Sequence, residues 1–387
     1  MAFRRAQRLE QLPPYLFAEI DRKKKAAIAA GRDVINLGVG DPDRPTPDFI
    51  IEELNRAAHD ARNHQYALDA GLPAFRRAAA DWFRKRFDVT LDADTEILPT
   101  LGSKEAIGHL PLAVLDPGDV ALIPEPGYPP YRSGTVFAGA EPYLMPLTAA
   151  NGFLPDLDAI PVSVLARAKL IFVNYPNNPT ARVAPRAFYE TLVAFARKHG
   201  LIVASDAAYS EVYFDAKPMS FLEIDGAREV GIEFHSLSKT FNMTGWRIGF
   251  STGNAQIISH LARIKSNLDS GIFQAIQVAG VKALENADRV TPDLIAMYRR
   301  RRDAMVAGLR EAGWTVTPPE AAFYMWIPTP GRAPSTEVAS RLLEEADIVV
   351  TPGIGFGPSG EGYVRATLTV DEARIREAVD RIARLSF

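Results

Sequence analysis

Short apolar segments alternate with helix-like stretches through the middle of the 387-residue chain. The apolar segments lie at residues 95–99, 119–124, 169–174, 201–206, 230–235 and 247–252. Most lack the apolar–polar alternation of a half-exposed strand, which is typical of a sheet covered on both faces. Helical patterns at 103–115, 185–199 and 255–285 lie between several of them. This order predicts an α/β fold with a mainly parallel sheet covered by helices.

From residue 284 onwards the pattern changes and predicts a second, smaller domain. A chain of this length exceeds what one hydrophobic core normally serves. A charged helical stretch at 284–312 is followed by short apolar segments and by helical patterns near 336–346 and 371–385, an α+β order. We therefore predict an N-terminal arm that packs on the small domain (1–45), a large ligand-binding domain (46–283) and a small C-terminal domain (284–387).

Charge and cysteine content exclude several classes of function. With 44 basic and 47 acidic residues the net charge is −3, so no basic surface favours nucleic acid or an anionic membrane. The chain has no cysteine and its six histidines form no metal-binding motif. No apolar run of the sequence is long enough to span a bilayer, and the opening segment has basic pairs without an apolar stretch, so we expect no secretory leader. We expect a cytoplasmic, metal-free protein.

A lysine follows the fifth predicted strand in the segment Ser236-Leu237-Ser238-Lys239, and Arg247 comes shortly after it. Taken alone, Lys239 would be a solvated loop residue and Arg247 a salt-bridge partner. Together, two hydroxyl groups and a guanidinium suit a phosphate dianion. Lys239 beside them is an amine that can form an imine. Ser103 and Lys104, after Gly102 at the start of a predicted helix, form a second possible anion site, although Ser103 is equally an ordinary helix cap.

Asp206 ends the predicted strand at 201–206, where a buried carboxylate needs a cationic partner. A protonated pyridine nitrogen would be such a partner and would make the ring an electron sink; a helix cap is the simpler alternative. Tyr209 and Asn178 are possible donors to a phenolate oxygen on the same ring, although the Asn-Asn-Pro segment is by itself only a turn signal.

Two further residues point to a planar ligand and a carboxylate. Tyr128 follows a strand end and could stack on a ring, or simply pack against the prolines beside it. Arg365 stands in an otherwise apolar strand, where it requires an anion. A substrate carboxylate held by two hydrogen bonds would satisfy Arg365, and a structural ion pair is the competing interpretation.

In this order and spacing, the motifs NNPT, DxAY, SLSK and GWRIG resemble those of the fold-type I, class I and II aminotransferases, which use pyridoxal phosphate. The resemblance covers nearly the whole chain and implies that fold, with residues 46–283 as the cofactor-binding domain. It implies that Lys239 is the Schiff-base residue and proton carrier, that Asp206 pairs with the ring nitrogen and that Tyr209 contacts the ring hydroxyl. Further cofactor contacts would be Ser103, Lys104, Tyr128, Asn178, Ser236, Ser238 and Arg247.

The resemblance also implies partners. Tyr66 matches a tyrosine that reaches the phosphate of the neighbouring subunit, which implies a homodimer with shared active sites. The substrates would be an amino acid and a 2-oxo acid. Their contacts would fall on Tyr15, Gly40, Lys104, Tyr128, Asn178 and Arg365.

Within the family the chain most resembles the LL-diaminopimelate aminotransferases, on segments such as LPPYLF, LGSKEAI and DSGIFQAIQ. This implies a reaction of LL-2,6-diaminopimelate with 2-oxoglutarate in lysine biosynthesis. The alternatives are an aminotransferase for alanine, aspartate, an aromatic amino acid or succinyl-diaminopimelate, and a β-lyase with the same cofactor. A transcription regulator on this fold would need an added DNA-binding domain, and a dinucleotide-binding dehydrogenase would need the GxGxxG motif; the sequence has neither feature.

Overall fold

The computed structural model describes residues 3–12, 17–67 and 70–387. Its main element is a seven-stranded sheet of order β2-β8-β7-β6-β5-β3-β4. Strand β8 runs antiparallel to both neighbours, while the pairs from β7 to β4 are all parallel. The sheet is therefore mainly parallel, as predicted. Its strands are β2 (Ile97–Thr100), β3 (Val120–Glu125), β4 (Glu141–Pro146), β5 (Ala168–Asn174), β6 (Ile202–Asp206), β7 (Gly231–Ser236) and β8 (Gly249–Gly253).

Helices cover both faces of this sheet, which explains the apolar segments without alternation. In β5, Ile171 and Val173 face one hydrophobic cluster, and Leu170 and Phe172 face another. Helices α3, α4, α8 and α12 contribute to the first cluster, and α5, α6 and α11 to the second. Their bounds are α3 (Asp48–Ala58), α4 (Pro73–Phe87), α5 (Ser103–Val114), α6 (Pro129–Phe137), α8 (Arg186–His199), α11 (Ala255–Leu268) and α12 (Gln274–Glu285).

Two details of the large sheet region differ from the sequence-based expectation. The helical pattern at 255–285 is two helices, because α11 ends before a loop that contains Gly271 at φ 83°. The loop is held by Asp269, whose carboxylate accepts from the Gly271 backbone N–H at 2.7 Å. Strand β4 was not expected. Two prolines and a mostly half-exposed pattern disguise it, and both features are permitted because β4 is an edge strand.

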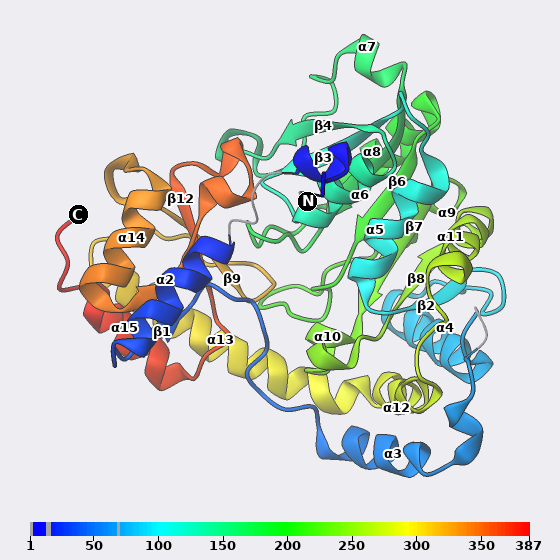
Figure 1. The fold of residues 1–387 in the computed structure, drawn as a ribbon, viewed down its shortest axis with the longest axis horizontal. Coiled ribbons are helices and arrows are strands. Elements are labelled where there is room, and N and C mark those ends of the chain that lie inside the picture. Colours follow the sequence, from blue (N-terminus) through cyan, green and yellow to red (C-terminus); the bar gives the residue numbers. More distant parts are fainter. Residues whose placement is uncertain (1–2, 13–16, 68–69) are drawn as a thin grey trace.

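The C-terminal part builds a smaller antiparallel sheet of order β11-β12-β9 around a hydrophobic cluster of its own. The N-terminal segment joins it, because β1 pairs in parallel with β10. Helix α13 runs from beside α12 to this smaller sheet (Figure 1). The predicted boundaries at residues 45 and 283 stay a prediction. The elements are β1 (Ile35–Asn36), β9 (Tyr324–Pro328), β10 (Ile348–Val349), β11 (Thr351–Pro352), β12 (Tyr363–Thr367), α2 (Phe17–Ala29), α13 (Ala287–Glu311), α14 (Ser335–Ala346) and α15 (Glu372–Ile382).

The described residues also form four short α-helices. Across the described ranges, no helix combines the length and the apolar character needed to cross a membrane. The short helices are α1 (Gln7–Glu10), α7 (Val162–Leu165), α9 (Ala227–Val230) and α10 (Leu237–Thr240).

Candidate active site

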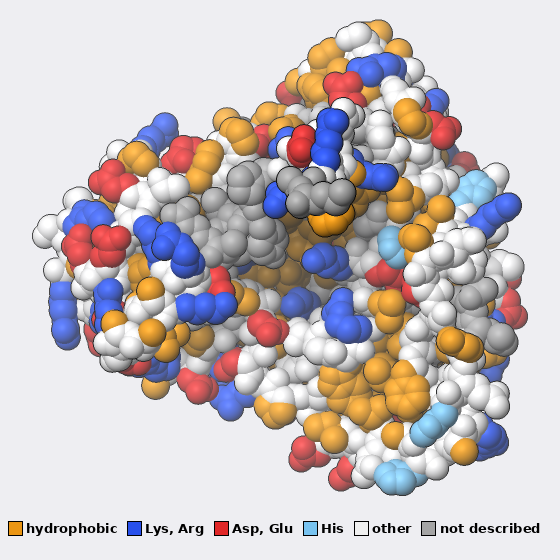
Figure 2. Space-filling view, in the orientation of Figure 1, with side chains coloured by type: hydrophobic (Ala, Val, Ile, Leu, Met, Phe, Trp, Pro, Cys, Tyr) orange, Lys and Arg blue, Asp and Glu red, His pale blue; other side chains and the backbone are white. Residues whose placement is uncertain are grey.

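The carboxyl ends of the parallel strands bring the predicted site residues to one edge of the large sheet. In a sheet of this kind, ligands bind outside these ends. Figure 2 shows Lys and Arg side chains in and beside a hollow near the middle of the molecular surface that it draws. The loops and helix starts after β3, β5, β6 and β7 carry, respectively, Tyr128, Asn178, Tyr209 and Lys239.

Lys239 lies in α10, directly after β7, with a largely buried ammonium group. Its Nζ donates to the Gly40 carbonyl oxygen at 3.2 Å, and no carboxylate of the described residues forms an ion pair with it. Burial lowers the pKa of Lys239 to about 8, against an opposing contribution from Asp41. Lys239 is therefore a buried amine with a substantial neutral fraction near neutral to mildly alkaline pH.

Asp206 is the buried last residue of β6. Its Oδ2 accepts from the Tyr131 hydroxyl at 2.7 Å and its Oδ1 from the Ala208 N–H at 3.2 Å. Burial raises the pKa of Asp206 to about 6, although these two hydrogen bonds act in the opposite direction. No lysine or arginine pairs with it among the described residues. A cationic ligand group beside Asp206 would supply the missing counter-charge.

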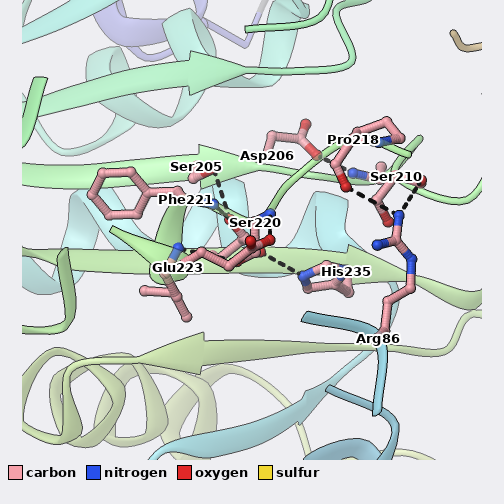
Figure 3. A network of polar contacts seen from close by, with 12 residues as sticks. Arg86, Ser205, Asp206, Ser210, Pro218, Ser220, Phe221, Glu223 and His235 are labelled. Carbon is pink, nitrogen blue, oxygen red and sulfur yellow. Dashed lines mark hydrogen bonds and ion pairs between the residues drawn. The ribbon is translucent and has the colours of Figure 1, made fainter. Parts of the chain in front are cut away.

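A network around a buried carboxylate connects β6 and β7 (Figure 3). Glu233 accepts from Ser205 Oγ at 3.1 Å, from Ser220 Oγ at 2.7 Å and from the Phe221 N–H at 2.9 Å. His235 Nε2 lies 2.8 Å from its Oε1. Sequence analysis missed this network, which ties the strand that carries the candidate carboxylate to the strand that leads to the candidate lysine.

Arg365 is buried in β12 and has no acidic partner in the part of the chain that the structure describes. Its Nη1 donates to Asn178 Oδ1 at 2.9 Å and its Nη2 to the Gly38 carbonyl oxygen at 2.7 Å. Its buried Nε has no hydrogen-bond partner among residues 3–12, 17–67 and 70–387. The structural ion pair considered from the sequence is therefore not formed, and the guanidinium is available to an anion that a ligand supplies.

The two possible phosphate elements lie side by side. Helix α5 begins at Ser103 after Gly102, which is the helix cap, so the alternative of Ser103 as the capping residue is wrong. Arg247 Nη2 donates to the Leu101 carbonyl oxygen at 2.8 Å. A Cβ atom at Gly102 would lie 2.4 Å from this nitrogen, so only glycine permits the approach. Lys104 is exposed at the same helix start. Ser236 caps α10 and accepts from the Ser238 N–H at 3.3 Å.

The aromatic residues are placed differently from one another. Tyr128 is half-buried, with its ring edge-on to Tyr131 at 5.8 Å. The Tyr209 hydroxyl lies 2.8 Å from the hydroxyl of Tyr324, a residue that sequence analysis did not select. Tyr66 is 81% exposed on the surface, where another molecule can reach it. The predicted contact Tyr15 lies outside the described residues.

One group of possible metal ligands is present among the described residues, formed by Glu105, His109 and Asp269. The Lys265 ammonium already lies within 3.2 Å of Glu105 Oε2 and 2.8 Å of Asp269 Oδ1. A cation of the protein itself therefore occupies the centre of this group, and the group forms a structural ion-pair network.

Comparisons with known proteins agree with this geometry. The family model of class I and II aminotransferases matches residues 32–382. A Syntrophobacter fumaroxidans protein named LL-diaminopimelate aminotransferase is 54% identical, with 100% of both chains covered. The substrate-bound BacF structure from Bacillus subtilis is 39% identical with a TM-score of 0.96, covering 100% of this chain and 99% of that one. A probable N-succinyldiaminopimelate aminotransferase from Thermus thermophilus is 34% identical with a TM-score of 0.90, at 95% and 99% coverage.

Proposed function

The chain belongs to the class I and II aminotransferase family, and we propose that it transfers the amino group between LL-2,6-diaminopimelate and 2-oxoglutarate with bound pyridoxal phosphate. The observation that carries the chemistry is a pair of buried, uncompensated charges at the ends of adjacent strands, the Lys239 amine and the Asp206 carboxylate. The relative at 54% identity over the whole chain supports the choice of substrate.

The residues present fit the cofactor. Among the described residues, Asp206 lacks a cation that a protonated ring nitrogen would supply, and no carboxylate forms an ion pair with the Lys239 amine. Tyr209 and Asn178 would face the ring hydroxyl, and Tyr128 would stack on the ring. When bound, pyridoxal phosphate supplies a protonated ring that withdraws electron density from the α-carbon of an amino acid. The phosphate would be held by Ser103, Lys104, Ser236, Ser238 and Arg247.

The residues of the chain then perform three tasks. Lys239 in its neutral form takes the α-proton of the amino acid and returns a proton during the reverse transfer. Asp206, ionised beside a cation, keeps the ring nitrogen protonated. Arg365 binds the α-carboxylate with two hydrogen bonds and orients the α-hydrogen towards Lys239, which lowers the entropic part of the barrier.

We also propose a homodimer with shared active sites, in which Tyr66 contacts the phosphate of the partner subunit. The residue is 81% exposed, so its side chain can enter a second subunit. The Tyr66 backbone is held in place, because its carbonyl oxygen accepts from Gln274 Nε2 at 3.2 Å. Sedimentation of the purified protein tests the assembly, and Tyr66→Phe, which removes only the hydroxyl, should weaken cofactor retention in a dimer.

The test of the function is a half-reaction without a 2-oxo acid. The cofactor-loaded protein is mixed separately with LL-diaminopimelate, glutamate, aspartate, alanine and phenylalanine, while the absorbance of the bound cofactor is followed. A fast change with LL-diaminopimelate and glutamate alone is the expected result. A change with one of the other amino acids but not with LL-diaminopimelate would keep the aminotransferase chemistry and assign it a different substrate. Release of pyruvate together with ammonia from an added amino acid that carries a leaving group on its β-carbon would identify a β-lyase, and a protein that retains no cofactor would overturn the chemistry.

A further inference from the structure

Tyr324 lies at the junction of the residues that we assign to the cofactor and to the substrate. We propose that Tyr324 is a positioning residue with two separable roles, in which its hydroxyl group directs the hydrogen bond of Tyr209 and its ring fixes the guanidinium plane of Arg365. This inference rests on the proposed function, because the roles of Tyr209 and Arg365 come from it.

The register of the small sheet places Tyr324 in this position. In the antiparallel pair of β9 and β12, Arg365 lies opposite Trp326 and Thr367 lies opposite Tyr324. Directly opposed residues and residues two apart share a face. Tyr324 and Arg365 therefore project from the same face of the smaller sheet, towards the edge of the large sheet where Tyr209 lies.

The role of the Tyr324 hydroxyl follows from the fact that each of the two phenols has a single proton to donate. The Tyr209 and Tyr324 hydroxyl oxygens are 2.8 Å apart, and the two residues are 7% and 3% exposed. Burial raises the pKa of both phenols, so each keeps its single proton. When Tyr209 donates that proton to a ligand oxygen, Tyr324 must be the donor in the bond between them. Such a chain of donors strengthens the bond from Tyr209 to the ligand.

The ring role follows from the surroundings of Arg365. The centroid of the Tyr324 ring is 4.4 Å from Arg365 Cζ, and the Phe356 ring is 4.8 Å from it. Ring faces attract a guanidinium and restrict its orientation. With both Nη atoms bound to Asn178 and Gly38, the rings restrict the tilt of the guanidinium plane and hence of the remaining N–H groups.

A third contact connects Tyr324 with the lysine. A Cβ atom at Gly40 would lie 2.2 Å from the Tyr324 hydroxyl oxygen, so the backbone passes directly against this group. The carbonyl oxygen of Gly40 is the acceptor for Lys239 Nζ. Any side chain at residue 40 would displace either Tyr324 or the acceptor of the lysine.

The matched control is Tyr298, a buried tyrosine of the same hydrophobic cluster. Its hydroxyl group has no partner in the described structure, so Tyr298→Phe removes a buried hydroxyl without removing a hydrogen bond. Tyr324→Phe removes the hydroxyl and keeps the ring, whereas Tyr324→Leu removes both.

Two measurements separate the roles. The first is the pH at which the absorbance of the bound cofactor changes. Without the Tyr324 hydroxyl, Tyr209 donates a weaker hydrogen bond to the cofactor, which disfavours the deprotonated form of the cofactor. Tyr324→Phe and Tyr324→Leu should therefore shift this midpoint upward by roughly half a pH unit, which corresponds to one modest hydrogen bond. Tyr298→Phe should leave the midpoint unchanged.

The second measurement is calorimetric binding of glutarate, an unreactive dicarboxylate, to the protein. Tyr324→Leu should weaken this binding about 30-fold, the size of a desolvated cation–π contact, while Tyr324→Phe should bind as the wild type does. An unshifted midpoint in Tyr324→Phe would overturn the hydroxyl role even if the leucine variant fails to fold. Unchanged glutarate affinity in a folded Tyr324→Leu protein would overturn the ring role. Failure of the proposed function itself would appear separately, as a wild type that retains no cofactor or performs no half-reaction.

Discussion

Asp206 and Glu233 are buried carboxylates on adjacent strands, yet their environments differ. Glu233 is 1% exposed, accepts three hydrogen bonds and lies beside His235. Asp206 is 4% exposed, accepts two, and has a pKa raised to about 6 by burial. A carboxylate that serves the fold is satisfied by the protein, whereas the candidate catalytic carboxylate is left for a ligand to complete.

The same contrast separates two buried arginines. Arg301 in α13 is 1% exposed and donates to both carboxylate oxygens of Asp43 at 2.7 Å. Arg365 contacts only neutral groups and keeps a buried Nε without a partner in the described part of the chain. Incomplete pairing of buried charge thus marks the candidate site more sharply than burial or residue type alone.

The largest expected effect concerns two lysines, Lys239 in the candidate site and Lys265 in an ion-pair network, and it tests whether they differ as the carboxylates and arginines do. Lys239→Ala should reduce turnover by at least about 10³-fold, because it removes the amine that carries the proton, while the melting temperature stays near that of the wild type. Lys265 is bound to Glu105 and Asp269. Lys265→Ala should therefore destabilise the protein by about 3 kcal/mol, since it leaves two partly buried carboxylates without their shared cation.

Steady-state kinetics and thermal unfolding of the two lysine variants make this test. Near-normal turnover by a folded Lys239→Ala protein would contradict the mechanism. A loss of stability in that variant as large as in Lys265→Ala would contradict the distinction between site and scaffold.

The next effect sharpens the contrast between the carboxylates. Asp206→Ala should keep bound cofactor, held by the phosphate contacts and Lys239, but lose roughly 10²-fold or more in turnover, because the ring nitrogen loses its counter-charge. Glu233→Gln should instead lower the free energy of unfolding by about 2 kcal/mol, since a buried hydrogen-bond network loses its charged acceptor. Wild-type rates in Asp206→Ala, measured with saturating cofactor, would remove Asp206 from its role.

Much of the fold could be predicted from the sequence because strand burial is encoded locally. The apolar segment of β5 alternates between two hydrophobic clusters, which requires apolar residues at nearly every position. The edge strand β4 could not be predicted in this way, because its exposed side tolerates Pro142 and Pro146, which interrupt the apolar pattern. The break at Gly271 escaped as well, because the residues around it remain compatible with helical periodicity.

The candidate site divides in the same way. Lys239, Asp206 and Arg365 could be selected because a charged residue beside or within an apolar strand is conspicuous in sequence. Tyr324 could not, because its partner Tyr209 is 115 residues away and lies after β6 of the large sheet, so only the packing of β9 against that segment brings the two together. Tyr131 was missed for the same reason, at 75 residues from Asp206.

The arginines provide a third test. Arg365→Leu should raise the KM for 2-oxoglutarate by roughly 100-fold, the value of a charge-assisted bidentate contact of about 3 kcal/mol, with little loss of stability. Arg301→Leu leaves Asp43 without its partner and should lower the free energy of unfolding by about 3 kcal/mol. Chemical denaturation and KM measured on both variants separate these outcomes. An Arg365→Leu protein with unchanged KM would assign the carboxylate contact to another residue.

The last effect concerns the pH dependence of the cofactor-free protein. Because the pKa of Asp206 rises from 3.8 to about 6 on folding, the folded state binds more protons than the unfolded state between these values. Stability attributable to this group is therefore lost as pH rises from 4 to 6, by up to about 3 kcal/mol at roughly 1.4 kcal/mol per unit. Asp206→Asn cannot ionise, so it should be more stable than the wild type at pH 7 and gain no such advantage at pH 4. Urea denaturation of both proteins at the two pH values measures this difference.

Because a cationic ring nitrogen would favour the ionised carboxylate, adding cofactor should erase the advantage of the asparagine variant at pH 7. An advantage that persists with cofactor bound would mean that Asp206 remains uncompensated, and would break the distinction between a carboxylate completed by a ligand and one completed by the fold.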